Sequence, residues 1–122
     1  MFDSVLIANR GEIAVRVVQA CRELGVTPVA VHSDTDATAK HVRLAAESHH
    51  IGGSVARNSY LDSAAILDAA RDAGVEAVHP GYGFLAESSE FAAVVEESPF
   101  VWVGPPSEIM RRFGEKARAR SL

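Results

Sequence analysis

The segment HPGYGFLAES, residues 79–88, places an aromatic ring between two glycines directly after a short apolar run. Gly81 and Gly83 permit positive φ and a close approach to the backbone, so the ring of Tyr82 is expected to point outward at the end of a strand. A ring in this position is suited to a small-molecule pocket. The alternative is a tight strand-to-helix connection in which Tyr82 and Phe84 fill the rim of the core. Composition alone favours that alternative.

A second candidate for chemistry is the basic segment RRFGEKARAR, residues 111–120. It holds five of the twelve basic residues of the chain and follows a connector at residues 104–106. Gly114 frees the backbone just before Lys116, whose flexible stem can carry an ammonium group to an anion. The other interpretation is a solvated run of charge, which is the more common role of such segments.

The first loop, IANRGEIA at residues 7–14, stands where a dinucleotide-binding fold carries its glycine-rich fingerprint. It has one glycine, Gly11, where that fingerprint needs three, so no NAD site is predicted. The five histidines show no paired ligand spacing, and most are expected to be surface or capping residues. Cys21 is expected to be a small buried hydrophobic residue. The sequence predicts no metal site and no catalytic side chain.

The elements that must position these residues follow one repeated rhythm, in which short apolar runs alternate with segments of helical period. This rhythm is typical of parallel βαβ units, and it predicts an α/β fold: a Rossmann-like open parallel sheet of about five strands with helices on both faces. Gly25 and Gly74 are expected to end helices, and Asp62 to begin one. Strands are expected at residues 4–8, 28–32, 48–51, 77–79 and 100–103, and helices at residues 11–24, 39–46, 62–73 and 89–97.

The break at residues 104–106 predicts two parts, a domain at residues 1–104 and a connector with the start of a further region at residues 105–122. A short helix is expected at residues 107–113, and the segment GEKARARSL is expected to begin another element that stops abruptly, as in a truncated chain. The length of 122 residues suits one domain, and the net charge of -4 argues against a nucleic-acid surface. The single cysteine and the short N-terminal apolar run predict a protein without an internal disulfide or membrane span, located in the cytoplasm or inside an organelle that the sequence does not name.

Five stretches carry a resemblance to a known family. In their order and spacing they resemble the N-terminal part of biotin carboxylase, the ATP-grasp subunit or domain of biotin-dependent carboxylases that act on acyl-CoAs or pyruvate. The resemblance covers essentially the whole chain, and ANRGEIA together with HPGYGFL is its most specific feature. The stretches are MFDSVLIANRGEIAVRVVQACRELG, AVHSDTDATAKHVRLAAES, SYLDSAAILDAA, HPGYGFLAES and FVWVGPPSEIMRRFGEKARA.

The resemblance implies a longer enzyme that uses ATP, Mg²⁺ and bicarbonate to form carboxyphosphate and then carboxylates a ureido nitrogen of biotin. It implies that Lys116 binds the ATP phosphates and that Tyr82 and Gly83 belong to the loop lying against biotin. The lid and the metal-binding carboxylates of the family are absent from these 122 residues. The chain alone is therefore expected to be inactive and to bind none of these ligands tightly.

The partners that the resemblance implies are the rest of the biotin carboxylase chain, a biotin carboxyl carrier protein or domain, and a carboxyltransferase. A homodimer contact is implied for Arg16 and Glu23, although Gln19 stands where some relatives have a basic residue. Two alternatives are open at this point. One is another ATP-grasp ligase, such as glycinamide ribonucleotide synthetase or carbamoyl phosphate synthetase, and the other is a non-catalytic scaffold or interaction fragment. The final carboxyl acceptor is not encoded in these residues.

Overall fold

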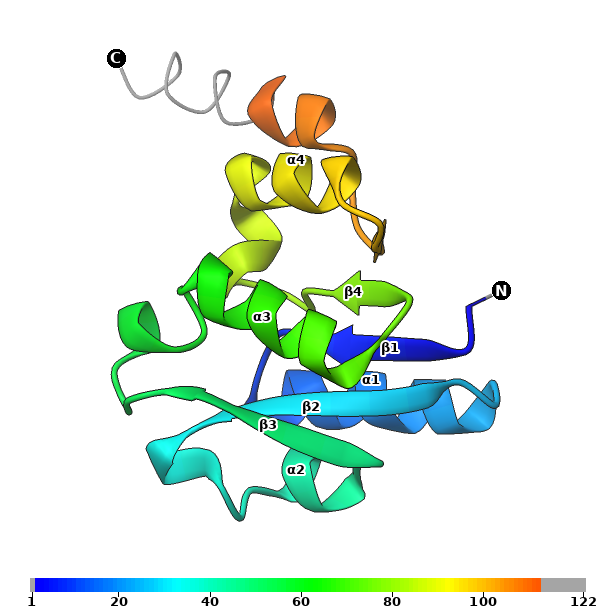
Figure 1. Cartoon of the computed structure of the whole chain (residues 1–122), viewed down its shortest axis with the longest axis vertical. Coiled ribbons are helices and arrows are strands. Elements are labelled where there is room, and N and C mark those ends of the chain that lie inside the picture. Colours follow the sequence, from blue (N-terminus) through cyan, green and yellow to red (C-terminus); the bar gives the residue numbers. More distant parts are fainter. Residues whose placement is uncertain (1, 113–122) are drawn as a thin grey trace.

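The computed structural model describes residues 2–112, which form a five-stranded parallel sheet in the order β3-β2-β1-β4-β5 (Figure 1). The Rossmann-like α/β class predicted from the sequence is confirmed, and no predicted strand end is displaced by more than one residue. The bounds are Ser4–Ile7 for β1, Thr27–Ser33 for β2, Glu47–Gly52 for β3, Ala77–His79 for β4 and Val101–Trp102 for β5.

Four α-helices connect these strands and cover both faces of the sheet. In Figure 1, α3 lies in front of the sheet and α1 lies behind it. α1 packs with α2 on one face, and α3 and α4 pack on the other, as two separate clusters of buried residues indicate. The helices are α1 (Gly11–Glu23), α2 (Lys40–Leu44), α3 (Ser63–Ala73) and α4 (Ser89–Glu97).

The order of the strands reverses at the boundary between β1 and β4. The chain adds β2 and then β3 on one side of β1, and α3 returns it to the other side, where β4 pairs directly with β1. In an open parallel sheet, ligands bind outside the carboxyl ends of the strands at such a reversal. Here the loops that leave β1 and β4 meet, and the N–H of Ala8 donates to the carbonyl of His79 at 2.9 Å.

Helix ends follow the local signals of the sequence. The carboxylate of Asp62 accepts from the N–H of Ala65 at 3.1 Å and caps α3, and Gly74 ends that helix at a φ of 68°. Ser88 caps α4 in the same way, accepting from the N–H of Phe91 at 3.1 Å. Ser88 therefore fixes the C-terminal end of the loop that follows β4.

α2 is shorter than the helix expected at residues 39–46. Ala45 already has extended backbone, with a ψ of 160°, and the N–H of Ala46 donates to the carbonyl of Pro28 at 2.9 Å. Pairing with β2 thus takes the chain out of the helix and into β3 early. Sheet pairing overrides the helical propensity of the alanines, a tertiary effect that local pattern does not contain.

The segment after β5 returns to α4. Residues 107–112 are helical, which agrees with the expected helix as far as the description extends. The hydroxyl of Ser107 donates to Oε1 of Glu96 at 2.6 Å, so this turn is attached to α4. The predicted domain boundary after residue 104 stays a prediction. Within residues 2–112, no helix combines the length and the apolar character that a membrane crossing requires.

Candidate functional site

The loop after β4 points its two aromatic rings in opposite directions. Tyr82 is 77% exposed, which confirms that its ring points outward. Phe84 is partly buried and stacks on the ring of Tyr60, with centroids 5.6 Å apart. The alternative interpretation, in which both rings fill the rim of the core, therefore holds for Phe84 and is wrong for Tyr82.

The two glycines of this loop have different roles. Both have positive φ, 67° for Gly81 and 68° for Gly83. A Cβ on Gly81 would lie 2.8 Å from Nδ2 of Asn9 and 2.8 Å from Cγ2 of Ile13, so the protein's own side chains occupy the space beside it. A Cβ on Gly83 would meet nothing within 4 Å. The expectation that both glycines open the backbone to a ligand is thus wrong for Gly81.

Asn9, at the end of β1, is 1% exposed and holds the loop after β4. Its Nδ2 donates to the carbonyl of Pro80 at 2.9 Å and to the carbonyl of Tyr82 at 2.7 Å. Its Oδ1 accepts from the N–H of Arg10 at 2.8 Å. This side chain therefore joins the first loop to the tyrosine loop through buried hydrogen bonds, which are costly to leave unmade.

A second polar network lies at the carboxyl ends of β1 and β2. Arg10 donates from Nε and Nη2 to the two carboxylate oxygens of Asp36, at 2.7 Å and 2.9 Å. The hydroxyl of Tyr60 donates to Oδ2 of Asp36 at 2.6 Å and accepts from the N–H of Ser33 at 3.1 Å. The hydrogen bond from Arg10 holds the pKa of Asp36 well below its ordinary value and outweighs the effect of burial. Asp36 is thus a buried, ionised carboxylate.

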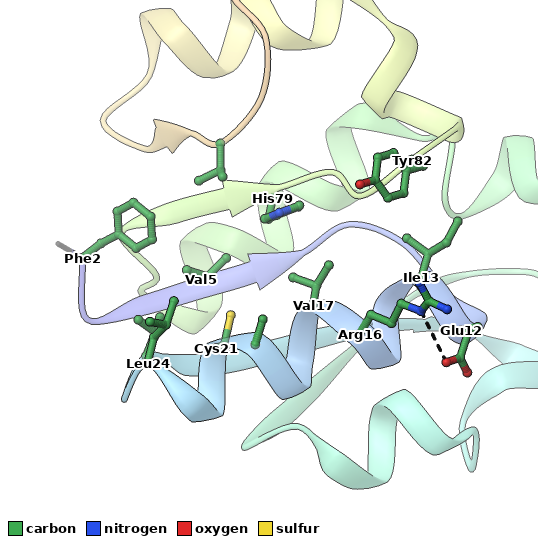
Figure 2. A pocket seen from close by; sticks show the side chains of 13 residues that line it. Phe2, Val5, Glu12, Ile13, Arg16, Val17, Cys21, Leu24, His79 and Tyr82 are labelled. Atoms are coloured by element: carbon green, nitrogen blue, oxygen red, sulfur yellow. Dashed lines mark ion pairs between the residues drawn. The ribbon is translucent and has the colours of Figure 1, made fainter.

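An apolar groove of about 630 Å³ runs between α1 and strands β1 and β4 (Figure 2). Val17 and Cys21 of α1 line its length, with Tyr82 and Ile13 at one end and Leu24 at the other. Cys21 is 8% exposed, which confirms its interpretation as a buried hydrophobic residue. The groove therefore begins at the tyrosine loop and continues along the incompletely covered face of the sheet.

His79 borders both the groove and the loop. Its Nδ1 accepts from the N–H of Gly81 at 3.0 Å, which requires that this nitrogen carry no proton. Burial lowers the pKa of His79 and so favours the neutral ring. The residues that face it across the groove include Glu12 and Arg16, which form an exposed ion pair at 3.7 Å. Neutral His79 is thus a further hydrogen-bond partner of the tyrosine loop.

The sequence-predicted site residues do not all meet. Tyr82 and Gly83 lie at the carboxyl edge of the sheet, and Arg16 lies at the rim of the groove that begins there. Glu23 is exposed near the end of α1. Lys116 lies outside the described residues. Among residues 2–112, no three His, Cys, Asp or Glu side chains are grouped so that they can hold a metal ion.

Sequence reasoning missed Asn9, Asp36 and Tyr60 as parts of the site. The spacing between each of them and its partners is long, so no local pattern signals the contacts. A weak signal exists for Asp36, which lies three residues after the end of β2, but Asp34 follows the same strand directly. His41 departs from the surface or capping role expected for most histidines. It is 1% exposed, and its Nε2 lies 3.0 Å from the carbonyl of Val31.

The sheet is open and parallel, and the loops after β1 and β4 meet where the strand order reverses. These features define the protein as a Rossmann-like α/β domain. The protein family described as "Biotin carboxylase, N-terminal domain" matches residues 1–110. The chain belongs to this family.

Relatives and solved structures agree with this membership. The chain is 53% identical over 119 residues to a biotin carboxylase of Allochromatium vinosum, a match that covers 98% of this chain and 26% of that protein. The biotin carboxylase domain of a thermophilic 2-oxoglutarate carboxylase, bound to ADP without magnesium, superposes with a TM-score of 0.90. It is 45% identical, and the match covers 99% of this chain and 27% of that one.

A dimer of the Hydrogenobacter thermophilus 2-oxoglutarate carboxylase biotin carboxylase domain is also similar. It has been solved in complex with MgADP, ADP and bicarbonate, and it matches with a TM-score of 0.85 and 46% identity. That match covers 91% of this chain and 24% of the other. The chain thus spans about a quarter of the length of each of these three proteins.

Proposed function

We propose that this chain forms the N-terminal domain of an ATP-dependent biotin carboxylase, a ligase that uses ATP, Mg²⁺ and bicarbonate to carboxylate biotin on a carrier protein or domain. The observation that carries the proposal is the 53% identity to a biotin carboxylase over 98% of the chain. The MgADP and bicarbonate bound to the Hydrogenobacter thermophilus domain support the same substrates. The pair of loops at the carboxyl edge of the sheet supports a ligand at this position.

Within this domain, Tyr82 and Gly83 are assigned to the edge of the biotin site. The Tyr82 ring is 77% exposed, and the backbone of Gly83 is open on the side where a Cβ would stand. An exposed ring and an accessible peptide group suit a flat apolar ligand with a polar ureido edge. The assignment follows the resemblance of HPGYGFL to the biotin-facing loop of the family.

Lys116 is assigned to the ATP phosphates. This residue lies outside the described part of the chain, so its assignment rests on the resemblance of the segment around it. A charge-assisted contact to phosphate is worth about 1.5 to 3 kcal/mol, so Lys116→Gln is expected to weaken ATP roughly ten- to a hundredfold.

The partners are assigned to two neighbouring surfaces of α1. The apolar groove between α1 and β4 is assigned to a following part of the same polypeptide, because the matched relatives are about four times as long as this chain. The exposed side chains of Arg16 and Glu23 are assigned to a homodimer contact, which the dimer of the Hydrogenobacter thermophilus domain supports. A carrier protein and a carboxyltransferase complete the proposed assembly. The domain itself is assigned to residues 1–104.

The test uses a joined carboxylase, in which residues 1–122 replace the matching segment of the Allochromatium vinosum biotin carboxylase. We expect it to cleave ATP in a manner that depends on biotin and bicarbonate. Tyr82→Ala should raise the KM for biotin with little change in stability, because an exposed side chain rarely contributes more than about 0.5 kcal/mol. Lys116→Gln should raise the KM for ATP and leave that for biotin unchanged.

The matched control is Val94→Ala, which trims an exposed side chain of α4 away from the loop. It should leave both Michaelis constants unchanged. An inactive joined carboxylase beside an active parent enzyme would contradict the proposal. A Tyr82→Ala variant with an unaltered KM for biotin would remove the loop from the biotin site.

The chain alone is proposed to be inactive. Stabilising the charge of phosphoryl transfer needs groups on both sides of the nucleotide, and the lid and the metal-binding carboxylates of the family have no counterpart in these residues. The measurement is ATP cleavage by the purified 122-residue chain with biotin, bicarbonate and Mg²⁺. Cleavage above that of the Lys116→Gln chain would refute this part of the proposal.

A further inference from the structure

The tyrosine loop is attached to the first loop of the chain by one buried amide. Nδ2 of Asn9 donates to the carbonyls of Pro80 and Tyr82, at 2.9 Å and 2.7 Å. Its Oδ1 accepts from the N–H of Arg10. Both N–H groups and the oxygen of this amide are thus engaged, and the two carbonyls on either side of Gly81 are fixed at one point.

A second attachment lies just beyond Gly83. Phe84 has a φ of 47°, which is uncommon for a residue with a bulky side chain. Its ring stacks on Tyr60, whose hydroxyl donates to Asp36, and Asp36 is bound by two N–H groups of Arg10. The strained backbone of Phe84 is therefore held by packing that ends in the same first loop.

These two attachments enclose Tyr82 and Gly83. Asn9 fixes the backbone before and at Tyr82, and the network that begins at Arg10 fixes the backbone after Gly83. The exposed ring of Tyr82 and the open side of Gly83 remain available between them. Two consecutive residues of the ANRGEIA motif are thus connected to the HPGYGFL motif, Asn9 directly and Arg10 through Asp36 and Tyr60.

We infer that Asn9 and Arg10 are positioning residues for biotin, which act by holding the backbone of Tyr82 and Gly83 in its binding geometry. This inference rests on the proposed function of that loop. A loop that is always in its binding conformation binds with its intrinsic Kd. If the loop adopts this conformation only part of the time, the apparent Kd equals the intrinsic Kd divided by the populated fraction. Losing either attachment should therefore raise the KM for biotin through the conformation of the loop.

The main test is Asn9→Asp in the joined carboxylase. The substitution keeps the size of the side chain and replaces the Nδ2 donor with a carboxylate oxygen facing two carbonyl oxygens. If the competent loop population falls to a tenth, the KM for biotin rises about tenfold. The KM for ATP and kcat at saturating biotin should stay within about twofold, because saturating ligand restores the competent loop.

The matched control is Asn58→Asp, which makes the same chemical change at an exposed turn. It should leave all three kinetic constants unchanged. Arg10→Gln removes the ion pair with Asp36 and so breaks the second attachment. Because the Arg10 side chain is 48% exposed, this variant is expected to fold, and it replaces Asn9→Asp in the test if that variant does not fold. It should raise the KM for biotin by a smaller factor, about threefold, and both variants should speed amide hydrogen exchange at residues 81–85.

The outcomes separate the inference from the function on which it rests. If Tyr82→Ala raises the KM for biotin while Asn9→Asp and Arg10→Gln behave like Asn58→Asp, the inference is wrong and the proposed function stands. If Tyr82→Ala has no effect on biotin, the proposed biotin site is wrong and the inference is lost with it. A fall in kcat with equal changes in both Michaelis constants would show a general structural role and would also overturn the inference.

Discussion

The face of the sheet under α3 and α4 buries 15 residues in one cluster, whereas the face under α1 and α2 buries seven and leaves a groove of about 630 Å³. Strands of a parallel sheet are ordinarily covered on both faces. β4 carries buried residues on both of its faces, Val78 toward α3 and α4 and Ala77 toward α1. The strands thus carry buried residues on two faces, and the described residues cover the α1 face only in part. This difference indicates that the groove on the α1 face can accept apolar side chains from outside the described residues.

The largest expected effect compares one leucine on each face. Leu67 of α3 is 6% exposed and Leu24 at the end of α1 is 65% exposed. In the 122-residue chain, Leu67→Ala should lower the free energy of unfolding by about 2–5 kcal/mol, because it leaves a cavity, and Leu24→Ala by less than about 0.5 kcal/mol. Urea unfolding followed by circular dichroism measures both.

Measuring Leu67→Ala and Leu24→Ala in the joined carboxylase as well tests whether the groove is covered there. If a following part of the polypeptide covers the groove, Leu24→Ala should cost more there than in the 122-residue chain, because the side chain becomes buried. Leu67→Ala should cost about the same in both. Equal costs of Leu24→Ala in the two proteins would leave the groove uncovered and break the proposed assignment.

A smaller effect is expected for the ionised carboxylate at the carboxyl edge of the closed face. Asp36→Asn removes a charge-assisted pair with Arg10 and should lower the free energy of unfolding by about 1.5–3 kcal/mol at pH 7. The pKa of Asp36 is depressed below its ordinary value of 3.8, so the native state is stabilised above that pH and loses this contribution as the pH falls further.

Melting temperatures of the wild-type chain and Asp36→Asn therefore should differ most above about pH 5 and converge below about pH 4. Asp34→Asn is the matched control, because Asp34 is exposed in the same 3₁₀ turn, Asp34–Asp36. If the difference in melting temperature between the wild-type chain and Asp36→Asn stayed constant down to pH 3, Asp36 would not be an ionised carboxylate paired with Arg10.

The smallest effect is expected at His79, on the open face. Burial lowers its pKa, so the unfolded chain takes up a proton more readily, and the native state loses stability as the pH falls below the ordinary value of 6.5. His79→Asn retains an acceptor near Nδ1 and does not titrate. The stability of wild type relative to this variant should fall between pH 7.5 and pH 5, by at most about 1.4 kcal/mol for each pH unit below 6.5, because the unfolded chain takes up a proton that burial keeps off the native ring.

Differential scanning calorimetry at several pH values measures this change. The other histidines are present in both proteins, so their titration cancels in the difference. A difference that is independent of pH would mean that His79 does not exchange a proton on unfolding in this range.

Much of the fold could be predicted from the pattern of neighbouring residues. The apolar runs located all five strands, and Asp62 and Gly74 located the ends of α3, because capping is a property of a few neighbouring residues. The glycines that flank Tyr82 at the end of a strand also indicated an exposed ring, although composition alone favoured a ring packed at the rim of the core. The family resemblance then supplied roles for Tyr82, Gly83 and Lys116 that pattern alone does not contain.

The hydrogen bonds that join the loops of the site could not be predicted from the sequence. Asn9 bonds to Pro80, and Asp36 bonds to Arg10 and Tyr60, across separations that only the strand order brings together. The sequence offered no reason to prefer Asp36 over Asp34. Long-range hydrogen bonds depend on which strands become neighbours, and the alternation of strands and helices does not specify that order.

The close approach of Gly81 to Asn9 restricts how this protein can diverge. A side chain at position 81 would collide with the amide at 2.8 Å, and a smaller residue at position 9 would abandon the two carbonyls it binds. A substitution at either position alone is therefore expected to disturb the loop, so the residues that fit at position 81 depend on the residue at position 9. The two motifs are therefore coupled mechanically, and this coupling does not depend on which ligand the loop binds.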